Sequence, residues 1–172
     1  MPTNTLIGSL ADLAQLTRPN AAHQSIRYEP LGRAHREQVA DLYRVSYPPG
    51  VGAADLDDAL AEVDATYAGE FGTLIAAASP VAMLGEQAVG SIQVVHRSPW
   101  DPDLDCPFII ELFVRPEARG KGIARALLTR AALACQRRRE TKIALRTSDQ
   151  GGTSPAAFHL YAVAGMAPCR PL

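Results

Sequence analysis

The sequence predicts an α+β fold in which helices flank one mixed central sheet. Short apolar runs that suit strands are interspersed with amphipathic stretches that suit helices, and this mixture is typical of helices packed against a sheet. The 172 residues, of which 47% are hydrophobic, are enough for one domain with a proper core. Neither an internal repeat nor an interdomain linker divides the chain.

The N-terminal part predicts an extension followed by the domain. Residues 1–25 hold a helix-like stretch from Leu6 to Leu16 and are otherwise weakly constrained, as chain ends often are. We therefore expect an N-terminal extension over residues 1–25 and the domain over residues 26–172. The domain is predicted to begin with a strand from Ile26 to Leu31.

Two helices are predicted next. The stretch Ala34–Tyr47 places Val39 and Leu42 on one side, as a helix with one buried face requires, and Pro-Pro-Gly then ends it. The stretch from Ala54 to about Phe71 has three aspartates near its start, where carboxylates interact favourably with the helix dipole.

The middle of the chain predicts the central strands. Val81–Leu84 and Ala88–Val95 are expected to form a hairpin across Gly-Glu-Gln, whereas Leu74–Ala78 suits either a helix end or a strand. A loop rich in proline and aspartate follows over residues 98–107, and the apolar run Phe108–Val114 then predicts another strand.

The last part of the chain predicts helix, strand and helix. Apolar residues at every fourth position predict a helix from Ile123 to about Arg139, and Lys142–Thr147 predicts a strand. Ser154, which is followed by proline, suits the cap of a last helix. Only six residues follow Met166 and two of them are prolines, so a final strand is expected to be short or missing.

Charge is distributed unevenly. The net charge is −1, yet residues 1–114 carry 6 Lys or Arg against 15 Asp or Glu, whereas residues 115–146 carry 10 against 2. Such a basic block indicates a phosphate-bearing small molecule or nucleic acid, although the triplet Arg137–Arg139 equally suits a helix C-terminus. No aromatic residue lies within this block, so a stacking platform for single strands is not indicated and we expect no nucleic-acid partner.

The composition argues against several other classes. No apolar run is long enough to span a bilayer, and the start lacks the pattern of a signal peptide. The three cysteines form no C-x-x-C pair, so neither a disulfide framework nor a metal site is indicated. We therefore expect a reduced, cytoplasmic protein with no membrane partner.

The segment Arg119–Ala124, which reads Arg-Gly-Lys-Gly-Ile-Ala, predicts an anion site between a strand and a helix. Glycine lets the backbone approach a ligand, and the first N–H groups of a helix lack internal partners at the positive end of its dipole. A P-loop is not indicated, because Gly120 and Gly122 are too close and no Lys-Ser/Thr pair follows. A dinucleotide loop is not indicated either, because Arg125 holds its third glycine position.

The segment resembles the acyl-CoA loop of the GNAT superfamily of N-acetyltransferases. That family carries R/Q-x-x-G-x-G/A after its fourth strand, and Arg119, Gly122 and Ala124 fill the specified positions. The usual lead-in, L-x-V-x-P-x-x-R-G-x-G, is matched from Leu112 to Gly122.

A second block of the chain resembles the late helix of the same family, N-x-x-A-x-x-L-Y-x-x-x-G-F. Ser154 stands in place of the usual Asn, and Met166 in place of the usual Phe. The four matching residues are Ala157, Leu160, Tyr161 and Gly165.

The resemblance implies the GNAT fold and transfer of an acetyl group from acetyl-CoA directly to a primary amine of a small molecule or peptide. An alternative is a non-catalytic acyl-CoA sensor on the same fold. The family normally adds a final strand or two after the last helix, so we expect a partner subunit, as in a homodimer, or the N-terminal extension to fill that place. The residues that the resemblance assigns to the cofactor are Leu112, Phe113, Val114, Arg119, Gly120, Lys121, Gly122, Ile123, Ala124 and Ser154.

Two residues are predicted to be catalytic. The resemblance gives Tyr161 the role of the acid that protonates the leaving thiolate, with a plain core tyrosine as the alternative. Glu111 is the candidate base, because it is the only ionisable residue in its apolar run and burial raises the pKa of a carboxyl group. His96 is a second candidate, and a water relay would need no dedicated base.

Strand alternation places Glu111 on the same face as Ile109 and Phe113. The acceptor side is expected to involve the first two helices and the loop before the central strand. Acidic side chains there favour a cationic amine, although solvated surfaces explain them equally well. The residues concerned are Tyr47, Asp55, Asp57, Asp58, Trp100, Asp101, Asp103 and Asp105.

Overall fold

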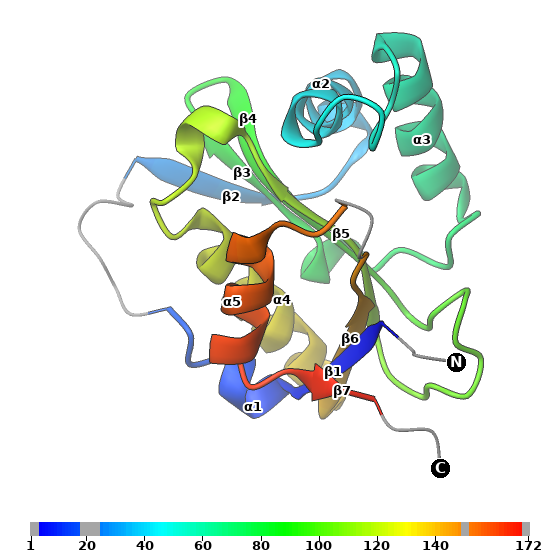
Figure 1. Cartoon of the computed structure of the whole chain (residues 1–172), viewed down its shortest axis with the longest axis vertical. Helices are drawn as coiled ribbons and strands as arrows, with labels where there is room; N and C mark the ends of the chain where they lie inside the picture. Colours follow the sequence, from blue (N-terminus) through cyan, green and yellow to red (C-terminus); the bar gives the residue numbers. More distant parts are fainter. Residues whose placement is uncertain (1–3, 18–24, 149–151, 170–172) are drawn as a thin grey trace.

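The computed structural model describes residues 4–17, 25–148 and 152–169. These residues form one mixed sheet of seven strands in the order β2-β3-β4-β5-β6-β1-β7, with helices on both faces (Figure 1). The strands are β1 (Thr5–Ser9), β2 (Ile26–Pro30), β3 (Pro80–Leu84), β4 (Gln87–Val95), β5 (Phe108–Val114), β6 (Lys142–Arg146) and β7 (Ala167–Pro168). The helices are α1 (Leu10–Leu13), α2 (Arg36–Ser46), α3 (Leu56–Ala68), α4 (Ile123–Arg137) and α5 (Pro155–Val163).

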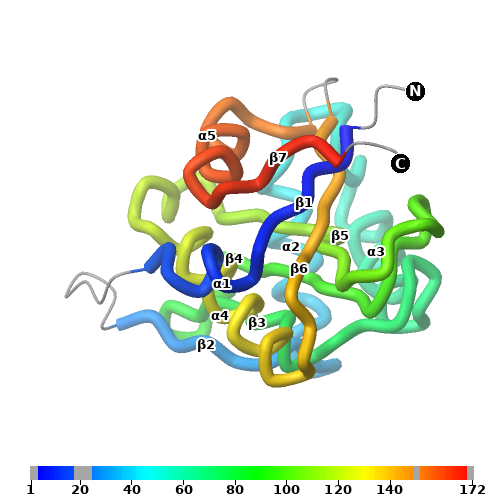
Figure 2. The backbone as a smooth tube through the Cα atoms, turned by 90° about the horizontal axis from the view of Figure 1, so that it is seen from below, coloured from blue at the N-terminus to red at the C-terminus, as the bar shows by residue number. Residues whose placement is uncertain are grey.

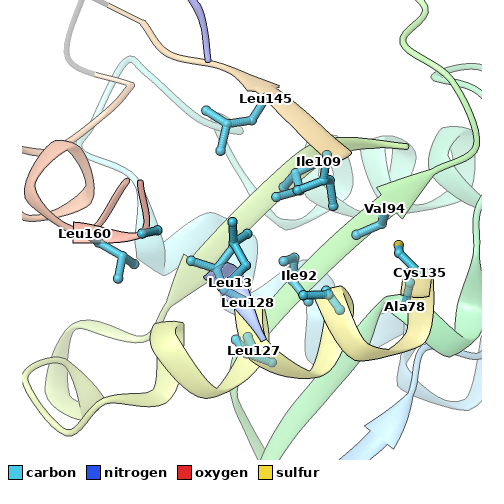
Figure 3. Packing of buried hydrophobic residues seen from close by; sticks show 14 of the residues in the cluster. Leu13, Ala78, Ile92, Val94, Ile109, Leu127, Leu128, Cys135, Leu145 and Leu160 are labelled. Atoms are coloured by element: carbon cyan, nitrogen blue, oxygen red, sulfur yellow. The ribbon is translucent and has the colours of Figure 1, made fainter. Parts of the chain in front are cut away.

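The predicted α+β fold is confirmed, and its layers follow from two apolar clusters. Helices α2 and α3 pack on one face, where Leu42 and Val63 meet Phe113 of β5. Helices α1, α4 and α5 cover the other face, and Figure 3 shows Leu128 of α4 close to Ile92 of β4. At Gly90 a side chain would reach within 2.8 Å of Ile123, so this glycine lets the start of α4 approach β4 closely.

Most element boundaries shift by a few residues from the sequence prediction. Helix α2 is preceded by a 3₁₀ turn over Arg33–His35. Asp55 begins α3 by accepting a 2.9 Å hydrogen bond from the N–H of Asp58, and Gly69 ends it with a φ of 82°. The ambiguous stretch before β3 contains a second 3₁₀ turn over Ala76–Ala78, and Leu74 forms an isolated bridge to β4.

The N-terminal segment is not a weakly constrained extension, and this expectation is corrected. Strand β1 pairs antiparallel with the whole of β6, from Thr5 opposite Arg146 to Ser9 opposite Lys142. The helix expected from Leu6 begins only at Leu10, because the Ser9 hydroxyl caps it by accepting from the N–H of Ala11. Residues 1–3 and 18–24 of the predicted extension lie outside the described residues.

Strand β1 extends the sheet beside β6, where it pairs with β6 on one side and with the last strand on the other. The expected short final strand is present as β7, which has two residues and pairs with β1 rather than with β6. Figure 2 shows β1 lying between β6 and β7. The sequence left two candidates for this place, a partner subunit and the N-terminal extension. The structure shows the N-terminal segment there.

We expect Leu13→Ala to lower the free energy of unfolding by about 2–5 kcal/mol, the usual cost of a buried Leu→Ala cavity. Leu13 is 0% exposed and packs in the cluster beneath α4. The exposed Gln15→Ala on the same segment is the control and should stay within about 0.5 kcal/mol of wild type. Urea unfolding measures both, and equal stabilities would show that this segment adds nothing to the core.

The helices of the described ranges include none that is both long enough and apolar enough to cross a membrane.

Candidate active site

A cleft opens where strands β5 and β6 separate. The two parallel strands pair only at Phe108 with Ala144 and at Ile109 with Leu145. On its other side β5 shifts register against β4, because Gln93 faces Glu111 whereas Val94 faces Ile109. Ile110 is thus an extra residue, and such a bulge bends the strand that carries it. The cleft has a volume of about 510 Å³ and lies between the ends of β5 and β6, the start of α4 and helix α5.

The bulge also changes which face each β5 side chain occupies. Simple alternation would put Ile109, Glu111 and Phe113 together. Instead Ile109 packs in the cluster on the α4 side, whereas Phe113 packs with α2 and α3. Glu111 bonds to Tyr47 at the end of α2, so the predicted grouping is right for Phe113 and wrong for Ile109.

The predicted anion loop forms one wall of the cleft. Gly120 and Gly122 have φ angles of 76° and 79°, a left-handed conformation that other residues adopt at a cost. Gly122 precedes the first turn of α4, where the amide N–H groups have no carbonyl partner within the helix. The loop therefore presents backbone donors at the positive end of the helix dipole.

Eleven of the twelve predicted site residues line the cleft, and Lys121 is the exception. Arg119 lines the cleft, but its charged side chain is held by hydrogen bonds to the backbone of this chain. Its guanidinium donates to the backbone carbonyls of Val114, at 3.0 Å, and Ser46, at 2.6 Å. The arginine of the loop pattern therefore ties the loop to the ends of β5 and α2.

Glu111 faces the cleft from β5. Its carboxylate accepts a 2.5 Å hydrogen bond from the Tyr47 hydroxyl. Burial raises the pKa of Glu111 to about 7, the Tyr47 hydrogen bond opposes that rise, and the Glu62 carboxylate adds to it. A carboxyl group with this pKa can accept and release a proton near neutral pH.

Tyr161 lies across the cleft on α5 and is 7% exposed. Burial, assisted by the charge of Glu111, raises the pKa of its phenol to about 12. Tyr161 therefore keeps its proton at neutral pH and is available as a donor. Ser154 lines the same cleft and caps α5 by accepting a 3.1 Å hydrogen bond from the N–H of Ala157.

The other candidate base lies elsewhere. The ring of His96 sits 3.3 Å from the Arg138 guanidinium and does not line the cleft. Burial, with the nearby positive charges of Arg138 and Arg97, lowers the pKa of His96.

Several acidic residues predicted for the acceptor side have structural partners. Asp101 forms a two-point ion pair with Arg146, with distances of 2.8 and 2.9 Å. Asp105 pairs with Arg97, and Asp55 is the cap of α3. Of the eight residues that the sequence predicted for the acceptor side, only Tyr47 lines the cleft.

Sequence reasoning did not foresee the bond between Tyr47 and Glu111, which lie 64 positions apart. It also missed His159 and Arg125, which line the cleft from α5 and from the first turn of α4. The spacing of three residues from Gly122 was the available signal for Arg125, whereas His159, two residues from Tyr161, had none. Within residues 4–17, 25–148 and 152–169 no three His, Cys, Asp or Glu side chains are grouped as metal ligands.

Similar folds are known among solved structures. A functionally unknown conserved protein from Staphylococcus epidermidis has a TM-score of 0.65 at 14% identity, covering 95% of this chain and 56% of its own. A GCN5-related N-acetyltransferase from Sphaerobacter thermophilus has a TM-score of 0.62 at 18% identity, with 95% and 47% covered. The present chain thus spans about half the length of these two proteins.

The aminoglycoside N-acetyltransferase AAC(6')-Iy in complex with CoA has a TM-score of 0.62 at 20% identity, covering 86% of this chain and 91% of its own. No curated protein matches the chain significantly. The model of the acetyltransferase (GNAT) family matches residues 36–166, a range that holds the splayed strands, the anion loop and the last helix. The chain therefore belongs to the GNAT family of acetyltransferases.

Proposed function

We propose that this protein transfers an acetyl group from acetyl-CoA directly to a primary amine of a small molecule or peptide. The observation that carries the proposal is the cleft itself. It brings together the backbone donors at the start of α4, a raised-pKa carboxyl on β5 and a protonated phenol on α5. Cofactor binding, proton removal and proton delivery are the three tasks that such a transfer needs.

The cofactor wall presents backbone N–H groups at the start of α4, with Arg125 beside them in its first turn. Gly120, Gly122 and the first residues of α4 would receive the pyrophosphate of acetyl-CoA. Beyond Ile109 the edge of β5 is unpaired toward β6, so the backbone at Leu112 and the N–H of Val114, whose carbonyl is already bonded to Arg119, would serve the pantetheine arm and the thioester carbonyl. A fixed N–H donor to that carbonyl stabilises the tetrahedral intermediate, by about 3 kcal/mol in measured cases.

The proton transfers follow from the two ionisable groups. Glu111 takes a proton from the acceptor ammonium, and the freed amine nitrogen attacks the thioester carbon. A C–N bond forms and the C–S bond breaks, and Tyr161 donates its proton to the departing thiolate. The nitrogen then loses its second proton, which water returns to the Tyr161 phenolate, and Glu111 releases the first proton to solvent.

A cationic acceptor is favoured by the carboxylates at Glu111 and Glu62, which are close enough for Glu62 to affect the pKa of Glu111. Another solved structure of AAC(6')-Iy holds a bisubstrate analogue that joins CoA to an acetylneamine group. That protein covers 86% of the present chain with a TM-score of 0.62 at 18% identity. We infer an amine-bearing acceptor here from the same fold and from this local negative charge.

Calorimetric titration with acetyl-CoA tests the cofactor site. We expect saturable binding near one site per chain for wild type and weaker binding for Gly120→Ala, because alanine at a φ of 76° costs about 1–2 kcal/mol and shifts the loop. Gly85→Ala is the matched control, since Gly85 also has a positive φ and open space around it but lies in the β3–β4 turn. Absent binding by wild type would refute the proposal.

A further inference from the structure

Tyr47 is held at the mouth of the cleft from several sides. It is the first residue after α2 and has an extended backbone with φ −101° and ψ 150°, as a residue before proline prefers. Its ring packs edge to face on Tyr43 and Phe113, with centroids 5.2 and 6.2 Å apart. Gly52 lies so close that a side chain there would come within 2.9 Å of the Tyr47 Cβ. The ring is therefore fixed by packing.

The fixed ring aims its hydroxyl at one oxygen of Glu111. The hydroxyl donates to Oε2 at 2.5 Å, and a hydrogen bond donated to a carboxylate favours its ionised form. Among the described residues no hydrogen bond is recorded to Oε1, which leaves that oxygen available to an acceptor amine. Burial beside Glu111 raises the pKa of Tyr47 far above its ordinary value, so the phenol stays a donor throughout the working range.

The surroundings of Glu111 otherwise favour its neutral form. Among the groups that face it, Glu62 from α3 adds a negative charge, whereas Tyr43 from α2 and Tyr161 from α5 are neutral phenols whose own pKa values Glu111 raises. Burial and the Glu62 charge both raise the pKa of Glu111, whereas the Tyr47 hydrogen bond is the influence that lowers it. Without that bond, less of the carboxyl would be ionised at neutral pH.

We propose that Tyr47 is a positioning residue that holds Glu111 ionised and turned toward the acceptor through its 2.5 Å hydrogen bond. This inference rests on the proposed role of Glu111 as the base. Tyr47 acts only through that carboxyl group, so a loss of its hydroxyl should change how Glu111 titrates rather than how the cofactor binds.

The test is the titration of Glu111 in Tyr47→Phe, followed by ¹³C NMR of labelled glutamate carboxyls and assigned with Glu111→Gln. We expect the pKa of Glu111 to rise by ~1 unit, because a hydrogen bond to the charged form is lost. Tyr43→Phe is the matched control on the same helix and ring cluster, and it should titrate like wild type. An unchanged titration in Tyr47→Phe, or an equal shift in both variants, would overturn the inference.

Acetyl transfer gives the second readout. In Tyr47→Phe the acidic limb of kcat/KM for the acceptor should move upward with the NMR pKa, so that activity falls several-fold at pH 7 and recovers at higher pH. A purely structural role would lower activity equally at every pH. The NMR titration needs no turnover, so failure of the Tyr47 inference is distinguishable from failure of the base, which a fully active Glu111→Gln would show.

Discussion

Replacing Tyr161 with phenylalanine is expected to lower kcat by about 10²-fold or more, the usual contribution of a positioned general acid. The phenol is buried and has a pKa of about 12, so it is protonated at every working pH. Phenylalanine keeps the ring in the core and removes only the proton donor, so the leaving thiolate would depart unassisted. Acetyl-CoA affinity should not change, because the ring remains in place.

Steady-state turnover and acetyl-CoA titration of the same preparation measure both quantities. Tyr28→Phe is the matched control, since Tyr28 has a buried hydroxyl with no hydrogen-bond partner in the described chain and lies on β2, outside the cleft. Undiminished turnover in Tyr161→Phe would leave Tyr161 as a core residue. Cofactor binding by wild type without acetyl transfer to any amine would instead favour an acyl-CoA sensor.

Replacing Glu111 with glutamine is expected to lower kcat/KM for the acceptor by about 10²-fold at pH 8, as for loss of a general base. The pKa of Glu111 is raised to about 7, so wild-type activity should increase as the pH rises through about 7. That acidic limb should disappear in the variant. Exposed Glu117→Gln, on the 3₁₀ turn after β5, is the control and should keep the wild-type profile.

As the pH rises, the folding stability of wild type should fall through Glu111, whereas its activity should increase. A carboxyl group with a raised pKa binds more protons in the folded chain than in the unfolded one, so folding loses stability as the pH rises through the interval between the ordinary value of 4.5 and about 7. Glutamine carries no charge into the site. We therefore expect Glu111→Gln to be at least as stable as wild type at pH 8 in urea, and a large loss of stability would point to a structural role instead.

The parts of the fold that local sequence patterns encode could be predicted. The glycines at 120 and 122, the apolar spacing of α4 and the serine cap of α5 each depend on residues within a few positions, and the structure shows all three. Eleven of the twelve predicted site residues line one cleft, because the two sequence blocks that carry them were each recognisable from local patterns. The catalytic and cofactor-binding roles of these residues stay predictions.

The remaining features depend on residues that are distant in sequence. Thr5 to Ser9 form a strand because β6 lies beside them, and nothing nearby in the sequence indicates that partner. The bulge at Ile110 is set by the register between β4 and β5, and it separates Ile109 from the face of Glu111. The hydrogen bond from Tyr47 likewise requires that α2 end above β5.

The position of β1 between β6 and β7 has a consequence for biosynthesis. Strand β1 is translated long before its partner β6, since Thr5 pairs with Arg146. Contacts so far apart in sequence form slowly, and unpaired strands are prone to aggregate before they form. The nascent protein must therefore keep β1 unpaired until translation has passed β6.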